Sequence, residues 1–366
     1  MVAVSGAPRP GGSDVGSPSA GDRGRLAAVV PTAGLSPHLE RCLEALRAEG
    51  IEAVVVHQGE GEPPEPARRL AGRVLRLPRN LGFAAATNVG IAATAGGYVA
   101  TVNDDAVVEP GWASALIAAL DADPGAAAAQ GSNLRLSDPA RLDGRGLAWN
   151  RWWQAVQVGH GEAAAATAEG AARSAPDARP VPPPDGGSEA VQGTHRSMSP
   201  EIVPDAPPRE VFGVSATAAL YRRSALEAVA LAPGEVFDER LGAYYEDVDL
   251  ACRLRRAGWG ALWEPAGRAL HAGSATGDRR RRWRLTRLYG NRWAVAARCL
   301  GRGFPAAAPR MAARDLADLA RAFGRGDLSA AGAIAAGWAR ALALLPGALH
   351  RGAPCVGSSP EEALRG

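Results

Sequence analysis

Short apolar runs alternate with longer amphipathic segments along the first half of the chain. Residues 26–30 are uniformly apolar, which predicts a buried strand. A helix is expected next, because Ser36 offers an N-cap, Pro37 suits the first helical position and Gly50 closes the segment. Its apolar residues have the i, i+3, i+4, i+7 spacing of one helix face: Leu39, Cys42, Leu43 and Leu46. This alternation is typical of an α/β domain with a largely parallel sheet.

The same alternation continues to about residue 130. Further strands are predicted at 51–56, 73–77, 98–102 and 127–130, and helices at 83–95 and 112–120. The strand at 98–102 runs directly into Asn103, Asp104 and Asp105. In open α/β sheets the carboxyl ends of the strands form the ligand-binding edge, so we expect this acidic turn to face a ligand.

The pattern stops between residues 161 and 209, where Ala, Gly, Pro and Ser dominate. Such a segment buries too little apolar surface to offset the entropy of ordering, so we expect a disordered insertion. Regular structure is predicted again as a strand at 211–221, a helix from Ser224, an amphipathic helix at 245–258 and a strand at 259–263. The region from 279 to 350 is basic, helical in pattern and rich in Ala and Leu.

Composition narrows the chemistry, because all 41 Lys and Arg positions are arginine and lysine is absent. Mechanisms that need a lysine amine are therefore excluded, including pyridoxal-phosphate Schiff bases, lysine-dependent aldolases and nucleotide kinases with a phosphate-binding lysine. A net charge of +3 argues against nucleic-acid binding, which needs a wider positive surface. The four cysteines are widely spaced, without a CxxC pair, and are expected to be reduced and structural.

The chain shows no sequence pattern of a signal peptide or a membrane span. Residues 1–25 are rich in Gly, Ser and Pro and lack a continuous apolar stretch. The longest uncharged stretch of the C-terminal region, 328–339, is interrupted by Arg340 before it could cross a bilayer. We therefore expect a cytoplasmic protein with a flexible N-terminal tail and no transmembrane helix.

Three groups of residues can carry catalysis, although each also has a structural explanation. The turn at 103–105 suits Asn and Asp, yet closely spaced acidic oxygens at a sheet edge also suit Mg²⁺ or Mn²⁺. Glu246, Asp247 and Asp249 begin a helix, where they stabilise its dipole, yet one of them could act as a general base. His271 follows a strand downstream of both acidic groups, which makes it a candidate metal ligand.

Taken in order, these segments resemble the family 2 glycosyltransferases of GT-A fold, especially their bacterial rhamnosyltransferase-like branch. The resemblance covers about residues 26–292 without the insertion. The motifs that carry it are Asn80-Leu81-Gly82-Phe83-Ala84-Ala85-Ala86-Thr87-Asn88-Val89-Gly90, Asn103-Asp104-Asp105 with Pro110-Gly111-Trp112, Phe237-Asp238-Glu239 with Tyr245-Glu246-Asp247-Val248-Asp249-Leu250 and Arg253, and Pro265 to His271. Each motif is weakly specific alone, and their occurrence in this order makes the resemblance strong.

The resemblance implies a GT-A fold with a mostly parallel central sheet, followed by a helical C-terminal extension. The implied organisation is a disordered tail at 1–25, a nucleotide-sugar (donor) binding half at 26–160, the disordered insertion at 161–209, an acceptor and catalytic half at 210–278, a basic helical region at 279–350 and a tail at 351–366.

The resemblance also implies inverting transfer of a sugar from a nucleoside-diphosphate donor, with no covalent intermediate. Asp105 and His271 would bind Mg²⁺ or Mn²⁺, which offsets charge on the leaving diphosphate. Asp247 would be the general base, with Glu246 as the adjacent candidate. The other donor-site residues implied by the motifs are Pro31, Asn80, Gly82, Phe83, Asn88, Asn103, Asp104 and Arg253.

The donor base is less defined, because two turns depart from the family pattern. Relatives usually have an Asp-Asn-Gly-Ser-like turn after the second strand, where this chain has His57-Gln58-Gly59-Glu60. The first strand ends in Pro31-Thr32-Ala33-Gly34, without the frequent Tyr-Asn. A dTDP-sugar and a UDP-sugar therefore both stay open as donors.

The acceptor and the location follow from the resemblance and from the basic run between Arg279 and Arg287. We expect transfer of a sugar such as rhamnose to a cell-envelope glycan or a polyprenyl-diphosphate-linked acceptor, with the basic run touching the inner face of the cell membrane. A solvated helix face would explain the same run. The alternatives to a transferase are a catalytically silent sugar-nucleotide-binding or scaffold protein of this fold, and a nucleotidyltransferase that consumes a nucleoside triphosphate.

Overall fold

The computed structural model describes residues 26–164, 207–273 and 281–350. The N-terminal tail, most of the expected insertion, the segment that holds Arg279 and Arg280, and the C-terminal tail lie outside the described residues. The disorder expected at 1–25, 161–209 and 351–366 therefore stays a sequence-based prediction, apart from the few residues at each end of the insertion.

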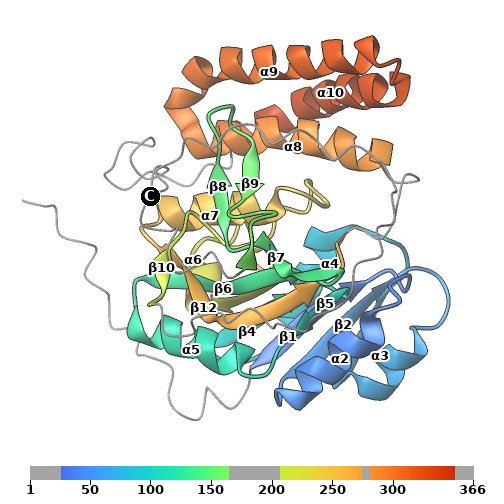
Figure 1. The fold of residues 1–366 in the computed structure, drawn as a ribbon, viewed down its shortest axis with the longest axis vertical. Helices are drawn as coiled ribbons and strands as arrows, with labels where there is room; N and C mark the ends of the chain where they lie inside the picture. The colour runs from blue at the N-terminus through green and yellow to red at the C-terminus, as the bar shows by residue number, and fades with distance from the viewer. Residues whose placement is uncertain (1–25, 165–206, 274–280, 351–366) are drawn as a thin grey trace, which may run out of the picture.

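A mixed sheet of ten strands forms the centre of the molecule (Figure 1). Its strands in chain order are β1 (Ala27–Thr32), β2 (Glu52–Gln58), β3 (Arg73–Leu77), β4 (Tyr98–Val102), β5 (Ala106–Val108), β6 (Ala126–Arg135), β7 (Asp138–Gly144), β10 (Arg209–Glu210), β11 (Ala218–Arg222) and β12 (Gly260–His271). Their spatial order is β10-β12-β6-β11-β4-β1-β2-β3, with β5 paired to β12 and β7 to β6. The pairs among β1 to β4 are parallel, as is β6 with β12, whereas β11 is antiparallel to both neighbours. The mostly parallel sheet expected from the sequence is confirmed.

Helices cover both faces of this sheet. They are α2 (Leu39–Ala48), α3 (Glu65–Leu70), α4 (Phe83–Ala92), α5 (Trp112–Ala122), α6 (Arg223–Ala228), α7 (Glu246–Arg256), α8 (Arg281–Leu300), α9 (Phe304–Gly324) and α10 (Leu328–His350). Along β1 the side chains alternate, so that Ala28 and Val30 pack with α2 and α5 while Val29 packs with α4. Gly90 of α4 lies so close to Val29 that a Cβ would fall 2.2 Å from it. Burial on both faces explains why these strands are continuously apolar.

The strands of the second half differ from the sequence prediction. Only the end of the expected strand 211–221 is regular, as β11, because residues 211–217 form a bend, an isolated bridge from Gly213 to Leu147 and a turn instead of a continuous strand. The strand expected to end at 263 continues to His271, since β12 pairs again with β6 after a bulge between Trp263 and Arg268. Gly131 permits the bulge, because a Cβ there would lie 2.1 Å from the carbonyl oxygen of Gly267. This extension of β12 carries His271 to the functional edge of the sheet.

The C-terminal helices form a further layer beyond α7, at the top of Figure 1. A short 3₁₀ turn (Gly301–Gly303) joins α8 to α9, and α10 packs along α8. The two helices approach closely at Gly290 and Gly337, where a Cβ on Gly290 would lie 2.8 Å from the carbonyl oxygen of Gly337. The helical C-terminal extension is therefore confirmed over 281–350. A separate hairpin, β8 (Leu147–Trp149) with β9 (Ala155–Gln157), rises from the sheet towards α8.

The expectation that all cysteines are reduced is wrong for one pair. Cys252 of α7 and Cys299 of α8 form a disulfide, with their Cα atoms 5.4 Å apart. The two positions are distant in sequence, so only the packing of α8 on α7 reveals that they meet. Cys42 is free and buried. The disulfide ties the C-terminal layer to the helix that begins with Glu246 and Asp247.

The expectation of no membrane-spanning helix also changes. Within the described part of the chain, Leu328–Ala348 of α10 is long and apolar enough to cross a membrane by length and composition, with a mean hydropathy of 1.5. The core helix of a globular layer satisfies the same criterion. Arg340, near the middle of this stretch, donates hydrogen bonds from Nη2 to the carbonyl oxygens of Arg240 (2.7 Å) and Leu241 (3.0 Å). These contacts tie α10 to the loop that precedes α7.

Candidate active site

A cleft of about 850 Å³ opens where β1 and β4 end. Its walls come from the sheet edge, from the start of α7 and from the first turns of α8. The predicted site residues that line it are Pro31, Asn80, Gly82, Phe83, Asn103, Asp104, Asp105, Glu246, Asp247 and His271. The structure therefore brings both acidic groups and the histidine into one cleft, although they are far apart in sequence.

The acidic turn after β4 is held from two sides. Thr32 donates a hydrogen bond from Oγ1 to Asp104 Oδ2 (2.6 Å), and Ser36 donates from Oγ to the Asp104 carbonyl oxygen (2.9 Å). Burial raises the pKa of Asp104 to about 6, with a further upward contribution from the charge of Asp105, while the Thr32 hydrogen bond opposes the shift. A nearby cation would favour the ionised form of this carboxyl group.

His271 lies between two carboxylates. Its Nε2 is 3.2 Å from Asp105 Oδ1, and its Nδ1 is 2.8 Å from Asp143 Oδ2 in β7. Burial lowers the pKa of His271, but the hydrogen bonds and charges of Asp105 and Asp143 outweigh it and raise the pKa to about 9. With a hydrogen bond to Nδ1 fixing the ring, Nε2 is the nitrogen that faces Asp105.

The donor set of this corner fits a divalent cation. Within the described residues no three His, Cys, Asp or Glu side chains are grouped as a metal site, so the protein offers a pair, Asp105 and His271. A carboxylate oxygen and an imidazole nitrogen suit Mn²⁺, and diphosphate oxygens and water can complete its coordination. Asp143 supplies the outer carboxylate that commonly orients a metal-binding histidine. Asp105 and His271 are therefore the residues that could hold the metal.

The carboxylates at the start of α7 differ in their surroundings. Glu246 is buried, and its Oε2 has no hydrogen-bond partner among the described residues. Burial raises the pKa of Glu246 well above its usual range, with the charge of Asp247 adding to the shift. Asp247 is only partly buried and accepts a hydrogen bond from the Val248 backbone N–H (2.8 Å). Burial also raises the pKa of Asp247, against the hydrogen bonds it accepts. Asp247 is therefore the better placed of the two to be ionised and open to a ligand.

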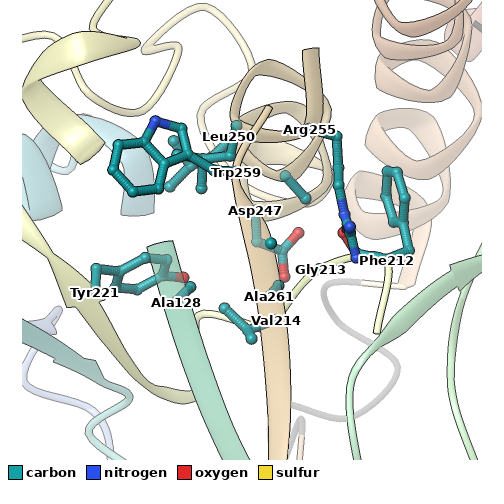
Figure 2. A pocket seen from close by; sticks show the side chains of 13 residues that line it. Ala128, Phe212, Gly213, Val214, Tyr221, Asp247, Leu250, Arg255, Trp259 and Ala261 are labelled. Atoms are coloured by element: carbon teal, nitrogen blue, oxygen red, sulfur yellow. Dashed lines mark hydrogen bonds between the residues drawn. The ribbon is translucent and has the colours of Figure 1, made fainter. Parts of the chain in front are cut away.

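Asp247 also lines a second pocket, between α7 and the sheet (Figure 2). The pocket measures about 10 Å³ and is mainly apolar, with Val214, Tyr221 and Ala261 among its lining residues. This volume holds a single water molecule at most. The carboxyl group thus stands between the large cleft and a small apolar cavity, which explains why its pKa is raised although the side chain reaches the cleft.

The turn that starts α7 is strained and is held by the C-terminal layer. Tyr244 and Tyr245 both have positive φ values, 67° and 73°, which non-glycine residues rarely adopt. Buried Asn291 of α8 donates hydrogen bonds from Nδ2 to the carbonyl oxygens of Leu241, Ala243 and Tyr244, at 3.0, 3.0 and 2.7 Å. Arg340 in turn donates from Nε to Asn291 Oδ1 (2.7 Å). The position of Asp247 therefore depends on α8 and α10.

Two residues predicted for donor binding do not reach the cleft. Asn88 is buried and donates from Nδ2 to the Phe237 carbonyl oxygen (2.8 Å) and to Glu239 Oε1 (3.0 Å). Arg253 is buried and donates to Asp249 Oδ2 (2.9 Å) and to two backbone carbonyl oxygens. Their polar groups are used inside the protein, and neither residue lines the cleft. The structure therefore gives both residues a structural explanation and lends no support to their assignment to donor binding.

Sequence reasoning missed several residues of the cleft. Asp143 carries no motif, and only the pairing of β7 with β6 brings it to His271. Trp283 and Arg284 belong to the basic run assigned to a membrane contact, yet both line the cleft, as do Tyr244 and Leu288. The one signal in the sequence was Trp283, an aromatic residue inside the arginine cluster. A helix face that only contacts solvent does not require a tryptophan.

The comparisons with known proteins agree with this geometry. Residues 27–156 match the family model described as "Glycosyl transferase family 2", which covers about a third of the chain. The match supports membership of that family and a glycosyltransferase activity. Together with the sheet order it confirms the expected GT-A fold. No curated protein is significantly similar to the chain.

Several solved structures are similar in fold at low identity. The mannosyltransferase PcManGT from Pyrobaculum calidifontis, in complex with GDP-Man and Mn²⁺, is 20% identical, with 90% of this chain and 85% of that chain covered and a TM-score of 0.46. TarS 1-349 from S. aureus is 14% identical, with 75% and 65% covered and a TM-score of 0.43. GalNAc-T7 with UDP, GalNAc and Mn²⁺ is 13% identical, with 68% and 43% covered and a TM-score of 0.44. The matched region thus spans less than two thirds of the last two proteins.

Proposed function

We propose that the chain is an inverting, metal-dependent glycosyltransferase of family 2 that uses a nucleoside-diphosphate sugar as donor. One observation carries the proposal: the Asp105–His271 pair and the Asp247 carboxylate line the same cleft at the carboxyl edge of the sheet. The family match over 27–156 covers the residues proposed for the donor side of that cleft, except His271. A cation-binding pair and a separate carboxylate are the two functions that such a transfer requires.

In the proposed reaction, Asp247 removes the proton from an acceptor hydroxyl group. The acceptor oxygen forms a bond to the anomeric carbon of the donor as the bond from that carbon to the diphosphate breaks. The proton ends on Asp247 and the electron pair of the broken bond leaves with the nucleoside diphosphate. Attack from the face opposite the leaving group inverts the anomeric configuration. The raised pKa of Asp247 strengthens it as a base at neutral pH.

The donor side of the cleft holds and orients the nucleotide sugar. Asp105 and His271 would bind Mg²⁺ or Mn²⁺, which supplies Lewis-acid stabilisation of the diphosphate when bound. Asp143 fixes the His271 ring, and Thr32 fixes Asp104 beside it. Further donor contacts are proposed for residues that line the same wall: Pro31, Asn80, Gly82, Phe83 and Asn103. Gln58, from the turn that departs from the family pattern, also lines the cleft and accepts a hydrogen bond from the Leu81 N–H (3.0 Å).

The finer assignments extend the proposal. We propose rhamnose as the transferred sugar, from a dTDP- or UDP-sugar, and a cell-envelope glycan or polyprenyl-diphosphate-linked molecule as the acceptor. The reaction would take place in the cytoplasm at the inner face of the cell membrane. These assignments are supported by the motif resemblance and by the basic start of α8 beside the cleft.

The test begins with a thermal-shift panel of UDP-, GDP- and dTDP-sugars, with and without Mn²⁺. A metal-dependent shift by one nucleotide class identifies the donor. Hydrolysis or transfer of that donor is then compared in the wild type, Asp105→Ala and Asp247→Asn. Both variants should lose turnover by about two orders of magnitude or more, while Asp247→Asn keeps donor binding.

An exposed carboxylate outside the cleft provides the matched control. Asp138→Asn, which changes the pair with Arg141, should leave turnover unchanged. Nucleotide binding without turnover on any acceptor would instead favour the catalytically silent binding protein. Full activity of both site variants would contradict the assignment of the cleft.

A further inference from the structure

The first turns of α8 form one wall of the cleft, and an aromatic ring stands on it. Trp283 lines the cleft and is 40% exposed. Its ring contacts the Tyr244 ring edge-on, with centroids 5.9 Å apart and an interplanar angle of 66°. The Arg287 guanidinium carbon lies 3.9 Å from the Trp283 ring centroid, in a cation–π contact. Two neighbours thus hold an exposed indole in place, which is the arrangement of a rigid binding platform.

The wall beside this ring carries positive charge. Arg284 lines the cleft and has no ion-pair partner among the described residues. The neighbouring Arg281 is paired with Asp327 (2.8 Å), and Arg287 lies against Trp283. Arg284 is therefore the guanidinium of this wall that stays available to a ligand. A guanidinium group binds phosphate or carboxylate oxygens through two parallel hydrogen bonds.

The position of this wall indicates which ligand meets it. The Asp105–His271 pair lies at the sheet edge, whereas Trp283 lies on α8, which belongs to the C-terminal layer at the top of Figure 1. Tyr244, which contacts Trp283, precedes Asp247 by only three residues. The wall that carries Trp283 thus adjoins the segment that carries the proposed base, whereas the proposed cation site is on the sheet-edge wall. A general base must reach the acceptor hydroxyl group, so the wall beside the base is the one where an acceptor would bind.

We propose that Tyr244, Trp283 and Arg284 form an acceptor subsite for a sugar ring that carries a phosphate ester. The apolar C–H face of the ring packs on the exposed indole, and Arg284 binds the phosphate. The inference rests on the proposed function, since it places the acceptor of that same reaction. A soluble sugar phosphate and a lipid-linked sugar diphosphate share this chemistry.

Three acceptor probes separate these sources. They are N-acetylglucosamine 1-phosphate, N-acetylglucosamine linked through a diphosphate to a short prenyl chain, and the neutral octyl N-acetylglucosaminide. Binding of each to the full-length protein is measured by calorimetry, with Mn²⁺ and the donor nucleotide present. The subsite requires that at least one phosphorylated probe binds more tightly than the neutral glycoside. Preference for the prenyl diphosphate points to a lipid-linked acceptor, and equal binding of both phosphorylated probes points to the sugar phosphate itself.

Variants then assign the contacts. Trp283→Ala should weaken binding of every probe that binds the wild type, by about tenfold, because the ring platform is lost. Arg284→Gln should weaken only the phosphorylated probes, by about tenfold, because a charge-assisted bidentate contact is lost. Arg282→Gln is the matched control, since Arg282 is exposed on the same helix and does not line the cleft, and it should change nothing.

Donor hydrolysis in the absence of acceptor distinguishes failure of this inference from failure of the proposed function. The Arg282→Gln control, which does not line the cleft, should hydrolyse the donor at the wild-type rate. Wild-type hydrolysis with no preference for phosphorylated probes, or with probe binding unaffected by both Trp283→Ala and Arg284→Gln, would overturn the subsite and leave the transferase intact. Absence of wild-type donor binding and hydrolysis would overturn the function on which the subsite rests.

Discussion

Removal of the Asp249 carboxylate should strongly destabilise the packing of α8 on α7. Asp249 is fully buried in α7 and accepts hydrogen bonds from Arg253 Nε (2.9 Å) and from Arg298 of α8. Arg298 also donates to Asp238 Oδ2 (2.7 Å). Each of these four side chains is at most 2% exposed. In Asp249→Ala, two buried guanidinium groups lose a partner, and water cannot replace it without opening the contact between α7 and α8.

The expected loss is about 3–5 kcal/mol in the free energy of unfolding, the usual effect of stranding a buried charge. For a protein of this size that corresponds to a melting temperature lower by roughly 4–9 °C. Urea unfolding followed by circular dichroism measures the loss. Glu65→Ala is the control, because its pair with Arg69 is about half exposed and should contribute less than about 1 kcal/mol.

A double-mutant cycle completes the test. Once Arg298 has been replaced by Ala, removing Asp249 should destabilise the protein by less than it does in the wild type, since one of the stranded charges is already gone. If Asp249→Ala behaved like Glu65→Ala, the four-residue network would carry no net stability and the reasoning from burial would be refuted.

Three further predictions concern pH, backbone contact and positioning. Burial raises the pKa of Asp238, but the hydrogen bonds from Arg240 and Arg298 outweigh burial and hold that pKa well below its usual range. The ionised Asp238 carboxylate therefore stabilises the fold at pH values above the ordinary Asp pKa of about 4, and this stabilisation is lost as the pH falls below that value. Urea unfolding above and below about pH 4 should show that acidification lowers the free energy of unfolding more in the wild type than in Asp238→Asn. Equal decreases in the two proteins would contradict this prediction. Gly131→Ala should lower the free energy of unfolding by about 1–3 kcal/mol in urea titrations, because a Cβ would lie 2.1 Å from the Gly267 carbonyl oxygen, whereas Gly324→Ala, with nothing within 4 Å, should be tolerated. Asn291→Ala should lower kcat by roughly tenfold to a hundredfold with the donor dissociation constant unchanged, because the turn that positions Asp247 loses its hydrogen bonds. Thr286→Val on the same helix is the control and should keep the wild-type kcat. A rise in KM without a change in kcat would contradict the positioning role.

The first strands of the sheet could be predicted well because β1, β2 and β4 are short, apolar and buried on both faces. β1 to β4 begin and end within a few residues of the predicted bounds, and the turn at 103–105 lies at the cleft as expected. Buried parallel strands leave a strong local pattern, since every side chain of β1 meets core on one face or the other. The bounds of such strands can be predicted from the local sequence alone, without knowing which distant residues pack against them.

The remaining features depend on contacts between distant segments. Asn88 lies in a motif, but a motif does not tell whether a side chain faces the cleft or the core, and Asn88 binds the backbone at 236–237 instead. Asp143 and Trp283 reach the cleft only through strand pairing and helix packing. The length of β12 was missed because a bulge interrupts its pattern between Trp263 and Arg268.

The hydrogen bonds from Asn291 to the turn before α7 also limit which segments of the chain can be replaced by those of a related protein. The segment that matches the family model ends at residue 156, whereas Asn291, which holds the turn before α7, lies in α8 and accepts a hydrogen bond from Arg340 in α10. The two halves of the chain nevertheless share one sheet, because β11 pairs with β4 and β6, and β12 pairs with β5 and β6. A chimera must therefore keep these strand pairs as well as the contact of α8 with the turn, and one cut between α7 and α8 would separate Asp247 from the hydrogen bonds that hold its turn.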